Sequence, residues 1–310
     1  MTITVLGECV ADAFTTDGRP GELALTVHPG GGPANTATAL GRLGTPTRFL
    51  GRLSADPFGA LFRDRLAGSG VDLADCVAAA EPSTLAIAAL DGDGQAGYTF
   101  HAEGTADFQW QRTELEAVDL SACTAVHTGS LALVRAPGAE AVEEFLARAG
   151  AHATVSIDPN LRPLLVAPEH YRERMARWCA LADLLRLSAD DLALLHPGLA
   201  PEQAVDHWHE LGVPLVVLTL GERGALVSLR GERASVEAVR TRVVDTVGAG
   251  DAFTAGLLHQ LGRSGLLGGR LTGAGLPAVL EAARFAARVA ALTCAVAGAN
   301  PPWPDRLAAG

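Results

Sequence analysis

From residue 125 onward, short apolar runs alternate regularly with longer segments of helical spacing. Strands are predicted at 125–129, 184–188 and 215–220, with a further strand beginning at Val155, and helices at 137–149, 169–182 and 201–211. Strands and helices that alternate in this way form a parallel sheet whose helices cross over from strand to strand. A buried strand is also expected at 3–6, and a long Ala-rich helix at 276–296. The order of these segments predicts an α/β fold.

Two β-prone runs in the N-terminal third predict a sheet separate from the main one. Runs 84–90 and 97–102 flank Asp91-Gly92-Asp93-Gly94, a sequence typical of hairpin turns. Together with residues 9–28 they are expected to form a small sheet. No internal repeat, low-complexity tract or linker divides the 310 residues, so a single domain is predicted over 1–310.

The charge content excludes several classes of function. The formal net charge is −11, and all 24 Lys and Arg residues are Arg. No basic cluster is present, which argues against nucleic acid and against an anionic membrane as partners. Because the chain has no Lys, a Schiff-base lysine and the lysine of a Walker P-loop are both excluded.

The cysteines and the apolar segments indicate a cytoplasmic protein. The five cysteines are scattered, odd in number and without a C-x-x-C pair, as expected of reduced thiols. The chain starts directly with the strand predicted at 3–6, without a basic cleavable leader. The apolar stretch 289–299 is too short to span a bilayer. The histidines show no spacing typical of metal ligands.

The stretch Asp245-Thr246-Val247-Gly248-Ala249-Gly250-Asp251-Ala252-Phe253 is predicted to be a loop that opens a helix. It follows a β-prone run at 241–244 and precedes apolar residues at helical spacing. Alternate glycines let successive amides turn toward one point, and a helix N-terminus attracts anions. Asp251 lies beside this anion site, where a carboxylate can deprotonate a hydroxyl that attacks a phosphoryl group. A first-turn aspartate is also common without any catalytic role, so the motif alone leaves both interpretations open.

A second candidate site lies near the N-terminus. Asp12 follows the strand at 3–6, where ligand groups gather in a parallel sheet. The glycines of Gly30-Gly31-Gly32-Pro33-Ala34-Asn35 permit close approach of a ligand to the backbone, before a helix at 34–43. A plain loop carboxylate explains Asp12 equally well, and for Asn35 the motif alone favours a polar residue at a helix start.

Together the two stretches resemble the two signatures of the ribokinase-like (PfkB) sugar kinases, in their expected order. The residues that carry the C-terminal resemblance are Asp245-Thr246-x-Gly248-Ala249-Gly250-Asp251-x-Phe253-x-Ala255-Gly256. The resemblance implies that Asp251 is the catalytic base and that the amides of Gly248, Ala249 and Gly250 form the anion hole. It also implies that the sugar is bound by Asp12, Gly31, Gly32 and Asn35.

Further site residues follow from the same resemblance. Thr219, Gly221 and Gly224 match positions that contact nucleotide phosphates, and Asp245 and Gly298 match loops around a potassium site. The string Asp158-Pro159-Asn160-x-Arg162 is similar to fructokinase and ketodeoxygluconate-kinase branches, which places Arg162 near the sugar or the transferred phosphate. A plain turn also explains Asp158-Pro159.

One expected metal position departs from the family pattern. Members often have Asn-x-x-Glu where this chain has Ser188-x-x-Asp191, and the acidic residue organises the water shell of Mg²⁺. Asp191 keeps a carboxylate and is the candidate for Mg²⁺ contact through water. The same string is also a good helix start, related to a capping box.

The resemblance implies a three-layer α/β/α sandwich around a mostly parallel sheet. It adds a small β-sheet lid, built from about residues 9–28 and 84–107, which in the family covers the sugar and often joins two copies. A homodimer through this lid is therefore expected.

Residues 98–107 resemble fructokinases more than ribokinases. We therefore expect ATP-dependent phosphorylation of a primary sugar hydroxyl, with Mg²⁺ and possible use of K⁺, and fructose as the first candidate substrate. Ketodeoxygluconate, ribose and nucleosides remain alternatives, as does a sugar or nucleotide sensor without catalysis. The absence of G-x-G-x-x-G after the first strand disfavours a dinucleotide-binding dehydrogenase.

Overall fold

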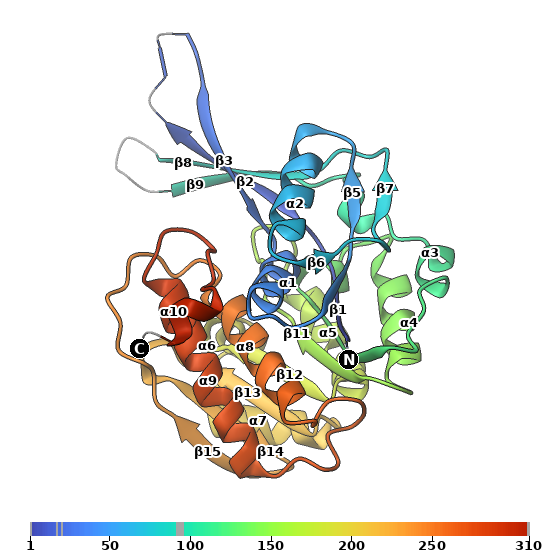
Figure 1. Cartoon of the computed structure of the whole chain (residues 1–310), viewed down its shortest axis with the longest axis vertical. Helices are drawn as coiled ribbons and strands as arrows, with labels where there is room; N and C mark the ends of the chain where they lie inside the picture. The colour runs from blue at the N-terminus through green and yellow to red at the C-terminus, as the bar shows by residue number, and fades with distance from the viewer. Residues whose placement is uncertain (1, 17, 20, 91–95, 309–310) are drawn as a thin grey trace.

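The computed structural model of the chain describes residues 2–16, 18–19, 21–90 and 96–308. The described part is built around a nine-stranded sheet in the order β15-β14-β13-β12-β11-β10-β1-β4-β6 (Figure 1). From β13 to β6 all neighbours pair in parallel, whereas β14 and β15 add antiparallel strands at one edge. The strands are β1 (Thr2–Leu6), β4 (Thr47–Leu50), β6 (Val71–Asp72), β10 (Cys123–Gly129), β11 (Thr154–Asp158), β12 (Leu184–Ser188), β13 (Leu215–Thr219), β14 (Ala225–Leu229) and β15 (Glu232–Val236). The predicted, mostly parallel sheet is confirmed.

Helices cover both faces of this sheet because successive side chains of each strand point to opposite faces. In β13, Leu215 and Val217 join an apolar cluster with α1, α2, α8 and α9. Val216 and Leu218 join a second cluster with α4, α5, α6 and α7. The helices are α1 (Gly32–Arg42), α2 (Pro57–Ala67), α3 (Arg112–Glu116), α4 (Ala139–Ala149), α5 (Pro168–Leu181), α6 (Ala189–Leu195), α7 (Pro201–Glu210), α8 (Ala249–Arg263), α9 (Leu276–Cys294) and α10 (Pro304–Ala308). The three-layer sandwich is therefore confirmed.

A second sheet, in the order β3-β2-β8-β9, projects from one end of the sandwich (Figure 1). Its strands are β2 (Val10–Thr16), β3 (Ala24–Gly30), β8 (Thr84–Leu90) and β9 (Ala96–His101). Strands β8 and β9 pair antiparallel, as predicted for a hairpin, and the turn Asp91–Gly94 lies outside the described residues. The separate small sheet is confirmed. A further two-stranded pair, β5 (Arg52–Ser54) with β7 (Val77–Ala79), was not predicted.

Asp107, in the short helix η1 (Ala106–Phe108), fastens the small sheet to the sandwich. Its buried carboxylate accepts the N–H of Cys9 at 2.8 Å and the hydroxyl of Thr84 at 2.7 Å. Cys9 precedes β2 and Thr84 begins β8. Both central strands of the small sheet therefore leave the sandwich from one anchored point.

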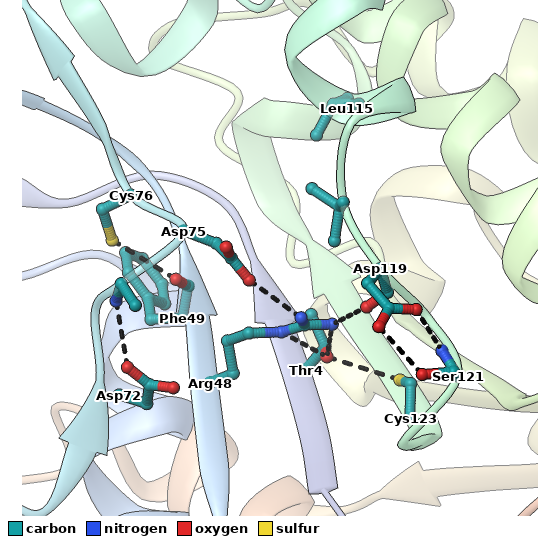
Figure 2. Close-up of polar contacts among 12 residues, drawn as sticks. Thr4, Arg48, Phe49, Asp72, Asp75, Cys76, Leu115, Asp119, Ser121 and Cys123 are labelled. Atoms are coloured by element: carbon teal, nitrogen blue, oxygen red, sulfur yellow. Dashed lines mark hydrogen bonds and ion pairs between the residues drawn. The ribbon is translucent and has the colours of Figure 1, made fainter.

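Arg48 of β4 ties neighbouring parts of the main sheet together. Figure 2 shows its side chain lying across Thr4 of β1, between Asp75 and Asp119. Nη1 donates to the Asp75 carboxylate at 2.8 Å, and Nη2 donates to the Thr4 hydroxyl and to the Asp119 carbonyl, each at 3.0 Å. These contacts join strands and loops, so the role of Arg48 is structural.

The β-prone run 241–244 is not a strand in the structure. Val243 and Val244 are 60% and 56% exposed. The N–H groups of Val244 and Asp245 both donate to the carbonyl of Cys294, at 2.8 and 3.3 Å. These hydrogen bonds attach the run to the C-terminal end of α9. Among the described residues, no strand pairs with it.

Two local features follow directly from the residue types at their positions. Asp56 caps α2 by accepting the N–H of Gly59 at 2.8 Å, with Pro57 in the first helical position. The connection between β13 and β14 is a glycine-containing hairpin. Within the ranges that the structure describes, none of the helices combines the length and the apolar character needed to cross a membrane.

Candidate active site

A cleft of about 380 Å³ opens between the small sheet and the carboxyl ends of the parallel strands, where α/β sheets bind ligands. The small sheet contributes Val10, Asp12, Thr84 and Phe100, and the strand ends contribute Glu8, Ser130, Asn160 and Arg186. The cleft brings together most of the residues expected from the sequence: Asp12, Gly31, Gly32, Asn35, Arg162, Asp191, Gly248, Gly250 and Asp251. Two motifs that are far apart in the sequence therefore meet in one pocket.

Asp251 lies in the first turn of α8, with its carboxyl facing the cleft. Its Oδ2 accepts a hydrogen bond of 2.9 Å from the side-chain amide of Asn35, which stands on α1. Burial raises the pKa of Asp251 to about 6, while the Asn35 amide opposes the rise. A carboxylate with this pKa is ionised at neutral pH and basic enough to accept a proton.

The glycine turn before α8 is shaped by its neighbours. Gly248 has φ of 75°, a left-handed conformation, and a Cβ there would lie 2.6 Å from the Cβ of Ala299. A Cβ at Gly250 would lie 2.7 Å from Nη1 of Arg186. The N–H of Gly250, in the first turn, has no partner within the helix, so it is available to an anion. The expected anion-hole amide of Ala249 differs, because it donates to the carbonyl of Thr246 at 3.2 Å.

The small sheet brings Asp12 to the cleft. Burial raises the pKa of Asp12 to about 6, although Arg162 and then His28 lower it. A Cβ at Gly30 would lie 2.0 Å from Oδ2 of Asp12. The glycine run therefore gives the Asp12 carboxyl its space, in addition to any contact that the run makes with a ligand.

Glu8, which sequence reasoning missed, also lines the cleft. It follows β1, is 1% exposed and accepts the N–H of Ala132 at 3.2 Å. Burial raises the pKa of Glu8 to about 7, while a hydrogen bond with Ser130 opposes the rise. A carboxyl that is partly protonated near neutral pH can both donate to and accept from a hydroxyl. No local pattern marks Glu8, since its burial depends on the whole fold.

Arg162 and Asn160 extend from the end of β11. Arg162 is exposed, and its Nη1 donates to the side-chain oxygen of Asn160 at 2.7 Å. Asn160 has φ of 40°, an uncommon left-handed conformation, and its amide nitrogen would lie 2.7 Å from a Cβ at Gly32. The loop thus holds a cation over the cleft, as expected for Arg162.

Arg186, also missed from the sequence, is the buried cation of the cleft. Its Nη1 donates to Asp158 at 2.8 Å and its Nη2 donates to the Thr219 hydroxyl at 2.7 Å. Burial alone would lower the pKa of Arg186, but the carboxylates around it, Asp158 first, outweigh burial, so the pKa is raised and the guanidinium stays charged. The alternation of buried and exposed residues alone gives no signal for a charged residue in the middle of the apolar strand β12.

Three residues expected to contact nucleotide phosphates lie outside the lining of this cleft. Thr219 is engaged with Arg186. Gly221 and Gly224 shape the β13–β14 hairpin with φ of 60° and 83°. A Cβ at Gly224 would lie 2.0 Å from the carbonyl oxygen of Val236, so the hairpin itself requires glycine there. Their contact with a nucleotide stays a prediction.

Asp245 and Gly298, the expected cation-site residues, are joined to each other. The Asp245 carboxylate accepts the N–H of Gly298 at 2.8 Å and that of Val247 at 3.0 Å. The bond from Val247 lowers the pKa of Asp245 most. The carboxylate thus ties the glycine turn to the loop after α9.

Asp191 is the acidic residue of a capping box at the start of α6. Its Oδ2 accepts from the N–H and the hydroxyl of Ser188, and its Oδ1 accepts from the N–H of Leu161 at 2.8 Å. Because both oxygens serve the protein, Asp191 suits outer contact through water better than direct metal binding. The part of the chain described by the structure holds no group of three His, Cys, Asp or Glu that could bind a metal.

Fold and cleft together indicate a kinase that phosphorylates a hydroxyl: a buried carboxylate lies beside the first amides of a helix. Comparison with known proteins gives the same class. Residues 2–306 match the model of the pfkB family carbohydrate kinases. The chain is 36% identical to a fructokinase of Rhizobium leguminosarum bv. trifolii over 267 residues, which cover 86% of this chain and 81% of that protein.

Solved structures give the same result. A fructokinase from Xylella fastidiosa with bound ATP superposes with a TM-score of 0.88 at 29% identity, covering 96% of this chain and 93% of that chain. A fructokinase double mutant from Vibrio cholerae O395, in a form with fructose, ADP and potassium ion bound, gives 0.82 at 28% identity, with coverage of 96% and 93%. The chain belongs to the pfkB family of carbohydrate kinases, which confirms the resemblance stated from its two motifs.

Proposed function

We propose that this carbohydrate kinase phosphorylates fructose with ATP and yields fructose 6-phosphate. The observation that carries the proposal is that Asp251 lies in the first turn of α8, beside the amides that open the helix, and lines the same cleft as Asp12 and Asn35. Similarity to proteins named fructokinase supports fructose as the substrate.

In this mechanism, Asp251 accepts the proton of the attacking hydroxyl. The hydroxyl oxygen forms a bond to the γ-phosphorus, and the bond between that phosphorus and the β,γ-bridging oxygen breaks, so ADP leaves. The amides of Gly248 and Gly250 stabilise the charge on the transferred group, and that of Ala249 joins them if it releases Thr246. Asp251 stands at the start of the helix with these amides, so the base and the anion site are fixed relative to each other.

The sugar would be held at the other end of the cleft. Asp12, Asn35 and the backbone at Gly31 and Gly32 are the proposed contacts to its hydroxyls, and Arg162 covers it from the β11 loop. Positioning of this kind converts a bimolecular reaction into an effectively unimolecular one. The small sheet is the proposed lid, whose closure would exclude water that otherwise hydrolyses ATP.

The nucleotide would lie beyond the glycine turn, near Thr219, Gly221 and Gly224. Mg²⁺ would arrive with ATP, neutralise phosphate charge and contact Asp191 through water, in keeping with the engaged oxygens of that carboxylate. A potassium ion is proposed beside Asp245 and Gly298, on the loop that meets the glycine turn.

Two copies are proposed to join through the small sheet. Phe14 and Tyr98 lie in one row across it and are 43% and 53% exposed, an apolar surface that a second copy would cover. Light scattering should give the mass of a dimer, and Tyr98→Glu should shift it toward the monomer. A monomeric parent protein contradicts this proposal.

The five free cysteines are in keeping with a reducing cytoplasm.

The decisive test is ADP release from MgATP with a panel of fructose, ketodeoxygluconate, ribose and nucleosides, with potassium or choline as the monovalent cation. The highest kcat/KM is expected with fructose, and phosphorus NMR should identify the 6-phosphate. A maximum with another sugar would retain the mechanism and reject the substrate. Binding of fructose without turnover would favour a sensor.

A further inference from the structure

The mechanism above leaves Arg186 without a role, although it lines the cleft. Its side chain is 7% exposed and comes from β12, at the centre of the sheet. Asp158 and Thr219 each accept one hydrogen bond from it, while its Nε has no hydrogen-bond partner among the residues that the structure describes. A buried guanidinium is costly unless its charge is used or fully paired.

The guanidinium lies directly against the anion site. A Cβ at Gly250 would lie 2.7 Å from Nη1 and 2.8 Å from Nη2, closer than real Cβ atoms approach. Glycine at this position therefore lets the cation approach the first turn of α8. The Gly250 amide and Arg186 line the same cleft, so both can face one bound anion.

The charge balance of the cleft calls for a cation at this place. Its lining residues include four acids, Glu8, Asp12, Asp191 and Asp251, and two cations, Arg162 and Arg186. Arg162 is exposed and bonded to Asn160 in the β11 loop, whereas Arg186 is buried beside the glycine turn. Arg186 therefore places a buried positive charge beside the amides that would receive the phosphate, in addition to the Mg²⁺ proposed to arrive with ATP.

We propose that Arg186 contacts the phosphoryl group during its transfer and stabilises the charge that develops on it. Asp158 and Thr219 are positioning residues, which fix the planar guanidinium from two sides. The proposal rests on the proposed kinase function. It also gives Thr219 a place in the site: Thr219 acts through Arg186 in addition to any contact of its own with the nucleotide.

The test compares two bound states of the full-length protein by calorimetry, with MgCl₂ and fructose present. One ligand is ADP, and the other is ADP with aluminium fluoride, which imitates the phosphoryl group in transfer. Arg186→Gln removes the charge and Arg186→Lys keeps it without the planar fork. Arg48→Gln is the matched control, because Arg48 is also an ion-paired arginine of the sheet but does not line the cleft.

In the parent protein, aluminium fluoride should tighten ADP binding at least 100-fold. Arg186→Gln should lose most of this gain and lower kcat by about 10²- to 10³-fold, in the range for one lost transition-state donor. Its affinities for ADP alone and for fructose should stay within threefold of the parent values. Arg186→Lys and Asp158→Asn should lose at least tenfold of the gain, and Arg48→Gln should keep it.

Other results would overturn the inference. A full aluminium fluoride gain in Arg186→Gln, or an equal loss of affinity for all three ligands, would leave Arg186 a structural residue. If Arg186→Gln does not fold, Arg186→Lys decides, and a parent-like gain and kcat in that variant reject the contact. If the parent protein shows no gain and no ADP release with fructose, the kinase proposal itself fails and the inference falls with it.

Discussion

The side-chain amide of Asn35 donates a hydrogen bond of 2.9 Å to the carboxylate of Asp251, 216 positions later in the chain. Asn35 stands on α1 next to the glycine run, and Asp251 stands in the first turn of α8. A bond between these helices fixes the proposed base relative to the residues proposed to bind the sugar. Small shifts of either helix should therefore affect the chemical step as well as sugar binding.

Asp251→Asn tests the base directly. The amide keeps the shape of the side chain but cannot accept the proton, so kcat should fall about 10³-fold. Fructose and ADP affinities, measured by calorimetry, should change less than threefold. Asp190→Asn, on the exposed side of α6, is the control. Activity of Asp251→Asn within tenfold of the parent would assign the proton to another group.

The dependence of kcat/KM on pH should report the ionisation of Asp251. With a pKa of about 6 for Asp251, the ionised form decreases below pH 6, and kcat/KM should fall tenfold for each further unit of pH. Asn35→Ala removes a bond that favours the ionised form, so the acid limb should move to higher pH. A limb that stays in place in Asn35→Ala, or persists in Asp251→Asn, would show that Asp12 or Glu8 governs it.

Gly250→Ala should damage the anion site, because the new Cβ would meet the Arg186 guanidinium. We expect kcat to fall at least tenfold and the unfolding free energy to fall by about 1–3 kcal/mol. Gly273→Ala is the matched control, since nothing lies within 4 Å of its Cβ position. Its stability and kcat should stay close to those of the parent, and a parent-like Gly250→Ala would mean that Arg186 can move aside freely.

Glu8→Gln should raise stability at alkaline pH. The pKa of Glu8 is raised from 4.5 to about 7 in the folded state, so its contribution to stability is present below pH 4.5 and is lost as pH rises through 7. At pH 8 the penalty is on the order of 3 kcal/mol. The advantage of Glu8→Gln over the parent in urea unfolding should therefore grow between pH 5 and 8. The control Glu116→Gln, at an exposed position, should show no stability advantage that increases with pH. If the advantage of Glu8→Gln does not increase either, the Glu8 carboxyl is solvated and the prediction fails.

The sequence predicted the elements whose signals are local. Alternation of apolar runs with helical segments predicted the parallel sheet, and Ser188 marked a helix start that the structure confirms. The two glycine motifs predicted most of the cleft, because glycines beside a helix start restrict what can bind there. The run 241–244 shows the limit: β-prone composition makes a strand only where a neighbouring strand is available.

The buried charged residues that sequence reasoning missed share a physical reason. Glu8, Asp107 and Arg186 are charged side chains whose surroundings come from distant segments: Arg186 pairs with Asp158, 28 positions away, and Asp107 holds Cys9, 98 positions away. Burial and pairing at that separation leave no periodic pattern in the chain. A buried charge can be recognised only when the folded neighbours are known.

The anchoring of Cys9 and Thr84 by Asp107 also sets how the small sheet can move. Because β2 and β8 both start at the Asp107 contacts, closure of the small sheet over the cleft would be a rotation about that point rather than a translation along the sandwich. Such a rotation would move Phe14 and Tyr98, which lie two residues from the cleft residues Asp12 and Phe100 in their strands. If two copies meet there, closing one cleft would press on the other, so the two clefts of a dimer would be mechanically coupled.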